Sequence, residues 1–352
     1  MNSCIDLCIE QIKEKIVDLS KQQIRLDIDE GKMGFCLYFY KLARLLNEPL
    51  YKKQAEKLLD DIYMELSNTS MLNTTYEIAQ IGIGIEYLIK HKYVSGNINS
   101  ILYDIDSLIF KTIIFEKKPT TYRTNGVFII LYYICIRIEQ QHLGSDARFM
   151  LEELCIKLFN ELYISLDSAF YDETYLFNLS NYKLPQFLYV VSKIYLLQFY
   201  NYRIIETIQE IAGFIKSRIP VLHSNRLYLL WGLLHLKKVT ELDIWDEQID
   251  MLASKVNCQK MIYKELRSKD VFIQDGVAGI YLLLTALKDT PHPIPFDKAL
   301  FLKRIEESAI WKDKEAFETL GFINGFSGFL WVCLELKASN NADERNLYLN
   351  IS

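Results

Sequence analysis

The stretches that decide the fold read DGVAGIYL at residues 275–282 and, one repeat later, NGFSGFL at residues 324–330. In both, two glycines three residues apart open a run of apolar and aromatic residues. Eleven of the 14 glycines of this chain lie in such a context, and along much of the chain they recur every 47–50 residues, as from Gly279 to Gly328. A fixed period in this range is typical of a stacked or closed array of one supersecondary unit.

Each repeat has two unlike halves. The segment after the glycines, such as residues 35–46, is apolar on nearly every side, which predicts a helix buried all round. The next segment, such as residues 51–63, is apolar with the i, i+4, i+7, i+8 spacing of a helix exposed on one face. A glycine-free repeat is expected at residues 181–191, followed by an amphipathic stripe of Ile204, Ile208, Ile211 and Ile215.

Buried helices that alternate with half-exposed ones predict two layers. An open stack would need a polar cap at its end, but the last buried segment, residues 328–336, is as apolar as the middle ones. We therefore predict an all-α fold, an α/α toroid of six or seven helical hairpins. It is expected to form a single domain over residues 1–338, with a polar C-terminal tail at residues 339–352.

Composition narrows the classes of function. The formal charge is −5 and no stripe of basic residues occurs, which excludes nucleic-acid binding. No apolar stretch reaches the 18 or so residues of a membrane span, and the N-terminus has no secretory signal. Seven cysteines without a C-x-x-C pair fit a reduced, cytoplasmic protein. The oligomeric state stays open.

The glycine-opened hairpins in this order resemble the lanthionine synthetase C-like family, the lantibiotic cyclases. The resemblance covers nearly the whole chain and is best at residues 276–280, 325–329 and 185–195. It implies a toroid that acts on a peptide, because enzymes of this family close thioether rings in a ribosomal peptide. In the family, a zinc ion held by two cysteines and a histidine ionises the peptide thiol and keeps one position for it.

The positions that match the family's metal ligands carry other side chains here. In the fifth repeat, the family pattern Arg-Leu-x-Trp-Cys-Tyr-Gly meets residues 226–232, which places Leu230 at the cysteine. In the sixth repeat, the pattern Cys-His-Gly-x-x-Gly places Gln274 and Asp275 at the cysteine and the histidine. We therefore predict that the chain holds no metal and no cofactor.

The acid/base position has changed as well. In the fourth repeat, the family pattern His-Gly-x-Pro places Tyr182 at the histidine, and the family's aspartate in the third repeat has no clear counterpart near Gly126. Among the functional positions of the family that can be matched to this chain, only Arg226 has the same residue type as the family. We assign no catalytic residue and expect no thioether-forming activity, so the resemblance favours a binding protein over an enzyme.

A different zinc site would have to draw on His223, His235, Cys258 and Asp275. The competing interpretation, which we favour, is that His235 is a core histidine and His223 a surface one. Cys4 and Cys8 share one helix face, but no third ligand accompanies them.

Three carboxylates leave hydrolase activity as a second possible class of function. Asp172 and Glu173 are adjacent in a predicted loop, and Asp275 opens a buried helix. Toroids of this kind also serve glycosidases, which need two carboxylates about 5–10 Å apart. The competing interpretation is that Asp275, and Asn324 at the same position of the last turn, cap their helices by accepting backbone N–H bonds.

Three hypotheses on function follow. The first, our main prediction, is a zinc-free relative of the lantibiotic cyclases that binds a peptide or partner protein in its central cavity during ribosomal peptide maturation. The second is a carbohydrate-active hydrolase, and the third is a non-catalytic scaffold whose cavity is filled by its own aromatic side chains.

If the cavity binds a ligand, four residues are expected to line one of its rims: Arg226, Tyr182, Asp275 and Asn324. Helix N-termini and a guanidinium at that rim favour an anionic group, so we expect an acidic peptide segment with Arg226 as its polar anchor. The alternative is that Arg226 pairs internally with Asp275.

Overall fold

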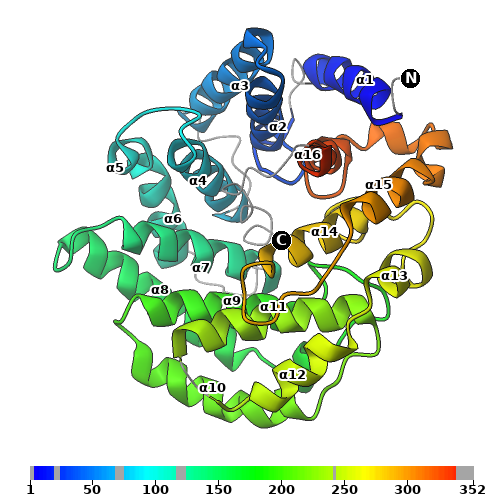
Figure 1. Cartoon of the computed structure of the whole chain (residues 1–352). Helices are drawn as coiled ribbons and strands as arrows, with labels where there is room; N and C mark the ends of the chain where they lie inside the picture. Colours follow the sequence, from blue (N-terminus) through cyan, green and yellow to red (C-terminus); the bar gives the residue numbers. More distant parts are fainter. Residues whose placement is uncertain (1–3, 20–23, 68–74, 116–123, 241–242, 338–352) are drawn as a thin grey trace. The chain divides into compact units, whose positions relative to one another are not determined.

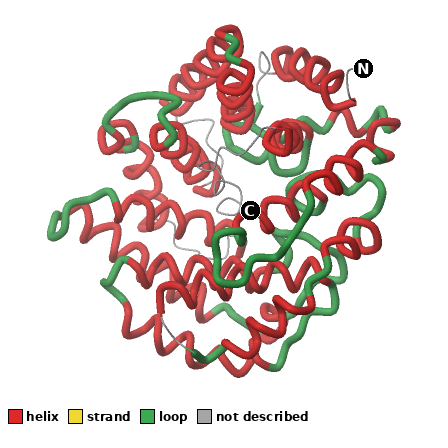
Figure 2. The backbone as a smooth tube through the Cα atoms, in the orientation of Figure 1, coloured by secondary structure: helices red, strands yellow, loops and turns green. Residues whose placement is uncertain are grey.

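The structure, a computed structural model, describes residues 4–19, 24–67, 75–115, 124–240 and 243–337 (Figure 1). Over these ranges every regular element is a helix and no strand occurs, which confirms the predicted all-α class (Figure 2). None of the helices in these ranges combines the length and the apolar character that a bilayer-spanning helix requires. The predicted tail at residues 339–352 lies outside the described residues.

The chain divides into two compact units. Unit 1 contains the described residues of 1–105, 266–282 and 297–348, and unit 2 contains those of 106–265 and 283–296. Two helices, α6 (Tyr103–Phe115) and α14 (Val277–Ala286), contribute residues to both units. The prediction of one domain over residues 1–338 stays a prediction.

Unit 1 is built around α2, which packs against α3, α4 and α16. Residues Lys32 to Leu42 of α2 are all buried, whereas α3 buries only the stripe that includes Tyr51, Ala55, Leu58 and Ile62, as the periodicity predicts. The helices that lie wholly in this unit are α1 (Cys4–Leu19), α2 (Lys32–Leu46), α3 (Pro49–Ser67), α4 (Thr75–Lys90), α5 (Ile98–Ile101), α15 (Lys298–Glu306), the short η4 (Ala309–Lys312) and η5 (Ala316–Glu318), and α16 (Phe326–Lys337).

Unit 2 is built around α9, which packs against α7, α10 and α11. The predicted glycine-free repeat is confirmed, since α9 begins at Lys183 and the isoleucine stripe of α10 is buried. The helices that lie wholly in this unit are α7 (Thr124–Glu139), α8 (Asp146–Ile164), the short η2 (Ser168–Tyr171), α9 (Lys183–Leu196), α10 (Asn201–Lys216), α11 (His223–Thr240), α12 (Asp246–Lys255), α13 (Cys258–Lys260) and the π-helical turn η3 (Met261–Glu265).

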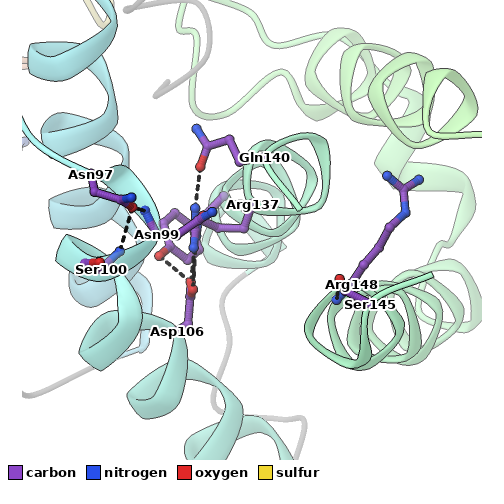
Figure 3. A network of polar contacts seen from close by, with 9 residues as sticks. Asn97, Asn99, Ser100, Asp106, Arg137, Gln140, Ser145 and Arg148 are labelled. Carbon is purple, nitrogen blue, oxygen red and sulfur yellow. Dashed lines mark hydrogen bonds and ion pairs between the residues drawn. The ribbon is translucent and has the colours of Figure 1, made fainter. Parts of the chain in front are cut away.

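An ion pair between buried Arg137 and half-buried Asp106 joins α6 to α7 within unit 2. Arg137 is 1% exposed, and its Nη2 lies 2.8 Å from Oδ2 of Asp106 (Figure 3). The same carboxylate accepts a 2.7 Å bond from the hydroxyl of Tyr133, and Gln140 accepts a bond from Nη1 of Arg137. Because the guanidinium has these partners, Arg137 can stay buried without the cost of an isolated charge.

Three helices whose first turns lie in unit 1 start in the same way. At α2, α14 and α16, the first backbone N–H groups donate to carbonyls seven residues earlier, which satisfies donors that a helix start leaves unpaired. The bonds run from Lys32 to Arg25 (3.0 Å), Met33 to Leu26 (3.2 Å), Val277 to Asp270 (3.1 Å), Ala278 to Val271 (3.1 Å), Phe326 to Thr319 (2.9 Å) and Ser327 to Leu320 (3.3 Å).

This fold-back explains the glycines that the sequence repeats. A Cβ at Gly276 would lie 2.5 Å from the backbone N of Val271, and one at Gly328 would lie 1.8 Å from the carbonyl oxygen of Phe322. Since neither the loop nor the helix can move away without breaking the seven-residue bonds, only glycine fits at these two positions of the turn.

Candidate functional site

Unit 2 contains a cavity of about 680 Å³ between the segment that precedes α9 and the loop that joins α10 to α11. We call it the Arg218 cavity. Both segments lead into helices on which the sequence placed functional residues. The cavity is lined by Tyr171, Asp172, Glu173, Thr174, Tyr175, Tyr182, Ser217, Arg218, Ile219, Pro220, Val221 and Leu222.

Arg218 is held flat against one wall of the cavity. Its Nε lies 3.1 Å from Oδ1 of Asp172, and its other nitrogens donate to the carbonyls of Phe214 (3.3 Å) and Ser168 (3.5 Å). The guanidinium carbon lies 5.8 Å from the ring centroid of Tyr171, which stacks on Phe214 at 4.9 Å. Three hydrogen bonds and two rings therefore fix the direction of this cation.

Glu173 ties the two segments of the cavity together. One carboxylate oxygen accepts from the backbone N–H of Val221 at 2.5 Å, and the other accepts from Nδ2 of Asn225 at 2.9 Å. Asn225 is fully buried at the start of α11 and also donates to the carbonyl of Thr174 at 2.8 Å. Because both oxygens of Glu173 are engaged in the wall, this carboxylate serves the cavity's shape.

Arg226 braces the loop that forms the cavity's second wall. Its Nε donates to the carbonyl of Pro220 at 2.6 Å, and its Nη2 donates to that of Val221 at 2.9 Å. Arg226, the predicted polar anchor, therefore donates at least two of its N–H groups to the loop itself. Its role toward a ligand stays a prediction.

Tyr182 lies directly before α9 and borders the cavity. The residue is 1% exposed, and its ring packs edge-on against Tyr228 with the centroids 6.2 Å apart. Burial, followed by the nearby charge of Glu173, raises the pKa of the Tyr182 hydroxyl well above its ordinary value. The hydroxyl therefore stays protonated at neutral pH and cannot act as the base that a histidine would be at this position.

The N-terminus of α11 is already occupied by a carboxylate of the chain. Glu265, in the π-helical turn η3, accepts from the backbone N–H groups of His223 (2.6 Å) and Ser224 (2.9 Å) and from the Ser224 hydroxyl (2.7 Å). The expectation that this helix end offers its N–H groups to an anionic ligand is therefore wrong for α11, because an internal anion satisfies them.

Asp275 and Asn324 lie in unit 1, in the turns before α14 and α16. The prediction that they cap these helices is wrong, because backbone carbonyls seven residues back take the first N–H groups. Burial, and next the charge of Asp270, raises the pKa of Asp275 above its ordinary value. That these two residues share a rim with Tyr182 and Arg226 stays a prediction.

The side chains at the three positions that the sequence resemblance matches to metal ligands do not fit a zinc ion. Leu230 is fully buried in α11 and offers no donor atom. Gln274 is an amide, and Asp275 is a single hard oxygen ligand, whereas zinc sites use thiolates and imidazoles. Within the described ranges, no three His, Cys, Asp or Glu side chains are grouped so that they could hold a metal ion.

The histidines and the cysteine weighed for a replacement site have other surroundings. His235 packs edge-on against the rings of Tyr189 and Trp231 at 4.9 and 5.0 Å, and burial lowers its pKa to about 4. His223 donates from Nδ1 to the carbonyl of Lys255 at 2.7 Å. The Cys258 thiol donates to the carbonyl of Pro295 at 3.4 Å, and burial raises its pKa to about 11. The side chain of Cys4 lies outside the described part.

The whole chain resembles a solved structure. Nisin cyclase matches with a TM-score of 0.66 and 15% sequence identity, over 97% of this chain and 96% of that chain. This chain shares its fold. The likeness confirms the predicted α/α toroid as the fold class, and the resemblance to lantibiotic cyclases holds at the level of the fold. No protein-family model and no curated protein matches the sequence.

Sequence reasoning missed three residues that build this site: Arg218, Asn225 and Glu265. Nothing in the local pattern sets Arg218 apart from the other basic residues of the chain. Asn225 carries a weak signal, since a polar side chain directly before an all-apolar helix has to be paired when it is buried. Apart from the carbonyl of Phe214, the partners that these side chains bind are 41 to 52 positions away, so spacing along the chain gives no sign of them.

Proposed function

We propose that this chain is a peptide-binding relative of the lantibiotic cyclases that acts in ribosomal peptide maturation, in the reducing cytoplasm, without zinc-dependent thioether chemistry. One observation carries this proposal. Leu230, at the position that resembles the metal-ligating cysteine, is 0% exposed in the core of α11. An aliphatic side chain packed there leaves neither a ligand nor room for an ion.

The acid/base position supports the same conclusion. A thiol that adds to a dehydrated residue needs a group that takes up and delivers protons near neutral pH. Tyr182 stands where the resemblance implies a histidine, and its raised pKa keeps the proton on the phenol. Neither the metal nor the proton-transfer function is therefore supported in this chain.

A binding role is favoured over a purely structural one because the Arg218 cavity of unit 2 is open and partly apolar, whereas the filling of the central cavity stays a prediction. Tyr175 is fully exposed at its lining, Val221 is 76% exposed and Ile219 is 49% exposed. Exposed apolar side chains around a cavity are typical of a surface that a ligand covers.

The hydrolase alternative has less support. A glycosidase needs a carboxylic acid and a carboxylate that face each other across the sugar bond. Asp172 and Glu173 are adjacent in the chain but turn to different partners, since Asp172 pairs with Arg218 and Glu173 bonds to Val221 and Asn225.

The proposal is tested with the purified full-length chain and a synthetic peptide that carries one cysteine and one dehydroalanine. We expect metal analysis by mass spectrometry to find far less than one zinc per chain. The peptide thiol should remain open to alkylation by N-ethylmaleimide at the same rate with and without the protein, also when zinc is added. Zinc held at one per chain, or protein-dependent loss of the thiol, would overturn the zinc-free assignment.

A further inference from the structure

We infer that the Arg218 cavity takes the cationic side chain of a bound peptide, lysine or arginine. This inference rests on the proposed peptide-binding function and names the chemistry of its ligand. It comes from the balance of hydrogen-bond donors and acceptors around the cavity.

The strong donors in the wall of the cavity are largely engaged. Each of the three nitrogens of Arg218 donates one hydrogen bond, to Asp172 or to the carbonyls of Phe214 and Ser168, and Asp172 balances the charge of the guanidinium. The N–H of Val221 donates to Glu173, and the amide nitrogen of Asn225 donates to Glu173 and to Thr174. An anionic ligand group would compete with Asp172 for the guanidinium and would lie near a second carboxylate, Glu173.

Acceptors are left over. The Asp172 side chain is 63% exposed, and its one ion pair among the described residues joins Oδ1 to Arg218, which leaves Oδ2 facing solvent. Oδ1 of Asn225 also has no hydrogen-bond partner among the described residues, but it is buried and does not line the cavity. The exposed carboxylate oxygen of Asp172 favours a ligand that brings N–H donors and positive charge.

The aromatic and aliphatic lining fits the rest of a basic side chain. Of the three tyrosines that line the cavity, Tyr171 and Tyr182 are buried and Tyr175 is fully exposed, so the ring face of Tyr175 is available to attract an ammonium or guanidinium group. The opposite loop carries Ile219 and Val221, against which the methylene stem of a lysine or arginine can pack. An acidic side chain would instead meet two carboxylates, Asp172 and Glu173.

The backbone of this loop offers little to a peptide main chain. The carbonyls of Pro220 and Val221 accept from Arg226, and the N–H of Val221 donates to Glu173. Pairing of the loop with a bound strand is thereby disfavoured, so recognition falls to a side chain.

The test uses three capped pentapeptides, Ac-Gly-Phe-Xaa-Gly-Gly-NH2, in which Xaa is lysine, norleucine or glutamate. Binding to the full chain is measured by ligand-observed NMR titration. We expect the lysine peptide to bind about tenfold more tightly than the norleucine peptide, and the glutamate peptide to bind most weakly. Asp172→Asn should remove most of the lysine preference, whereas the matched change Asp243→Asn, at an exposed carboxylate outside the cavity lining, should leave it unchanged.

A second variant is needed because Asp172→Asn also removes the ion pair with Arg218 and could loosen the cavity wall. Tyr175 is fully exposed, so Tyr175→Ala should keep the melting temperature and weaken the lysine peptide several-fold. Equal affinities for the three peptides, or a preference for glutamate, would overturn the cationic-ligand inference while peptide binding itself stands. Binding of none of the three would contradict the proposed peptide-binding function.

Discussion

The Oε2 atom of Glu265 lies 2.7 Å from the hydroxyl and 2.9 Å from the backbone nitrogen of Ser224. A side chain from the π-helical turn after α13 thereby caps α11, the helix that carries Arg226 and Leu230. The cap comes from 41 residues further along the chain, so the start of α11 depends on the tertiary structure and not on a local capping residue.

We expect Glu265→Ala to lower the free energy of unfolding by about 2 kcal/mol, because three donors at the start of α11 lose a charged acceptor. Urea denaturation measures the loss. Glu153→Ala is the control, since Glu153 is exposed in the interior of α8, and its effect should stay within about 0.5 kcal/mol. Equal stability of the two variants would mean that the cap contributes nothing.

A pair of Gly→Ala changes tests the fold-back turn. Gly328→Ala should destabilise the chain by about 3 kcal/mol or more, because its Cβ would overlap the carbonyl of Phe322 at 1.8 Å. Gly213→Ala has open space around its Cβ in the last turn of α10 and should stabilise by about 0.5–1 kcal/mol. Thermal unfolding of both variants checks the opposite signs, and a Gly328→Ala protein as stable as the parent would contradict the turn geometry.

The buried carboxyl of Asp27 predicts how the stability of the fold depends on pH. The residue is fully buried in the loop before α2, and burial raises its pKa to about 6, although Arg25 lies 2.6 Å away and Glu30 donates a backbone bond. The folded state therefore holds this proton more tightly than the unfolded chain. The stability that comes from the protonated carboxyl is full below about pH 4 and is lost as the pH rises through about 6.

The measurement compares the parent with Asp27→Asn at pH 4.5 and at pH 7.5. The free energy of unfolding of the parent, taken relative to the variant, should fall between these values by an amount on the order of 2 kcal/mol. A difference that does not change with pH, or one that grows as the pH rises, would show that Arg25 outweighs the burial of Asp27.

Two substitutions of Arg226 test whether the residue acts through its hydrogen bonds to the loop or through its charge alone. Arg226→Ala should lower the melting temperature by several degrees, because the carbonyls of Pro220 and Val221 lose their donors and the cavity wall loosens. Arg226→Lys should lower it nearly as much, since one ammonium cannot replace a two-pronged donor. If Arg226→Lys restored the parent's melting temperature, charge alone would account for the residue. Unchanged melting with lost peptide affinity would instead make Arg226 the ligand anchor that the sequence predicts.

The fold could be predicted from the spacing of apolar residues and glycines, because helix burial and repeat length depend on local sequence. The all-round apolar segment at residues 35–46 and the one-sided segment at 51–63 lie within α2 and α3. The glycine-free repeat appears as α9 and α10. The repeated glycine pair of the turn was also visible in the sequence. Its cause, the backbone hydrogen bonds to carbonyls seven residues earlier, could be seen only in the structure.

The site was harder to predict, because its parts pair over long separations. Asp275 and Asn324 were expected to cap helices on the strength of their residue type, but backbone carbonyls already take those donors. Conversely, Arg218, Asn225 and Glu265 find their partners 46, 52 and 41 or 42 residues away. No spacing along the chain reports such a contact.

The sequence by itself therefore determined the class of fold and the repeat, because both follow from residue type along the chain. That Leu230, Gln274 and Asp275 replace metal ligands stays a prediction from the resemblance. Only the tertiary structure decided where the donors and acceptors of the Arg218 cavity go. The physical reason is that a hydrogen bond depends on distance and direction in space. Whether Arg218 and Glu173 are open to a ligand or engaged in the wall is set by chain segments that the fold brings together.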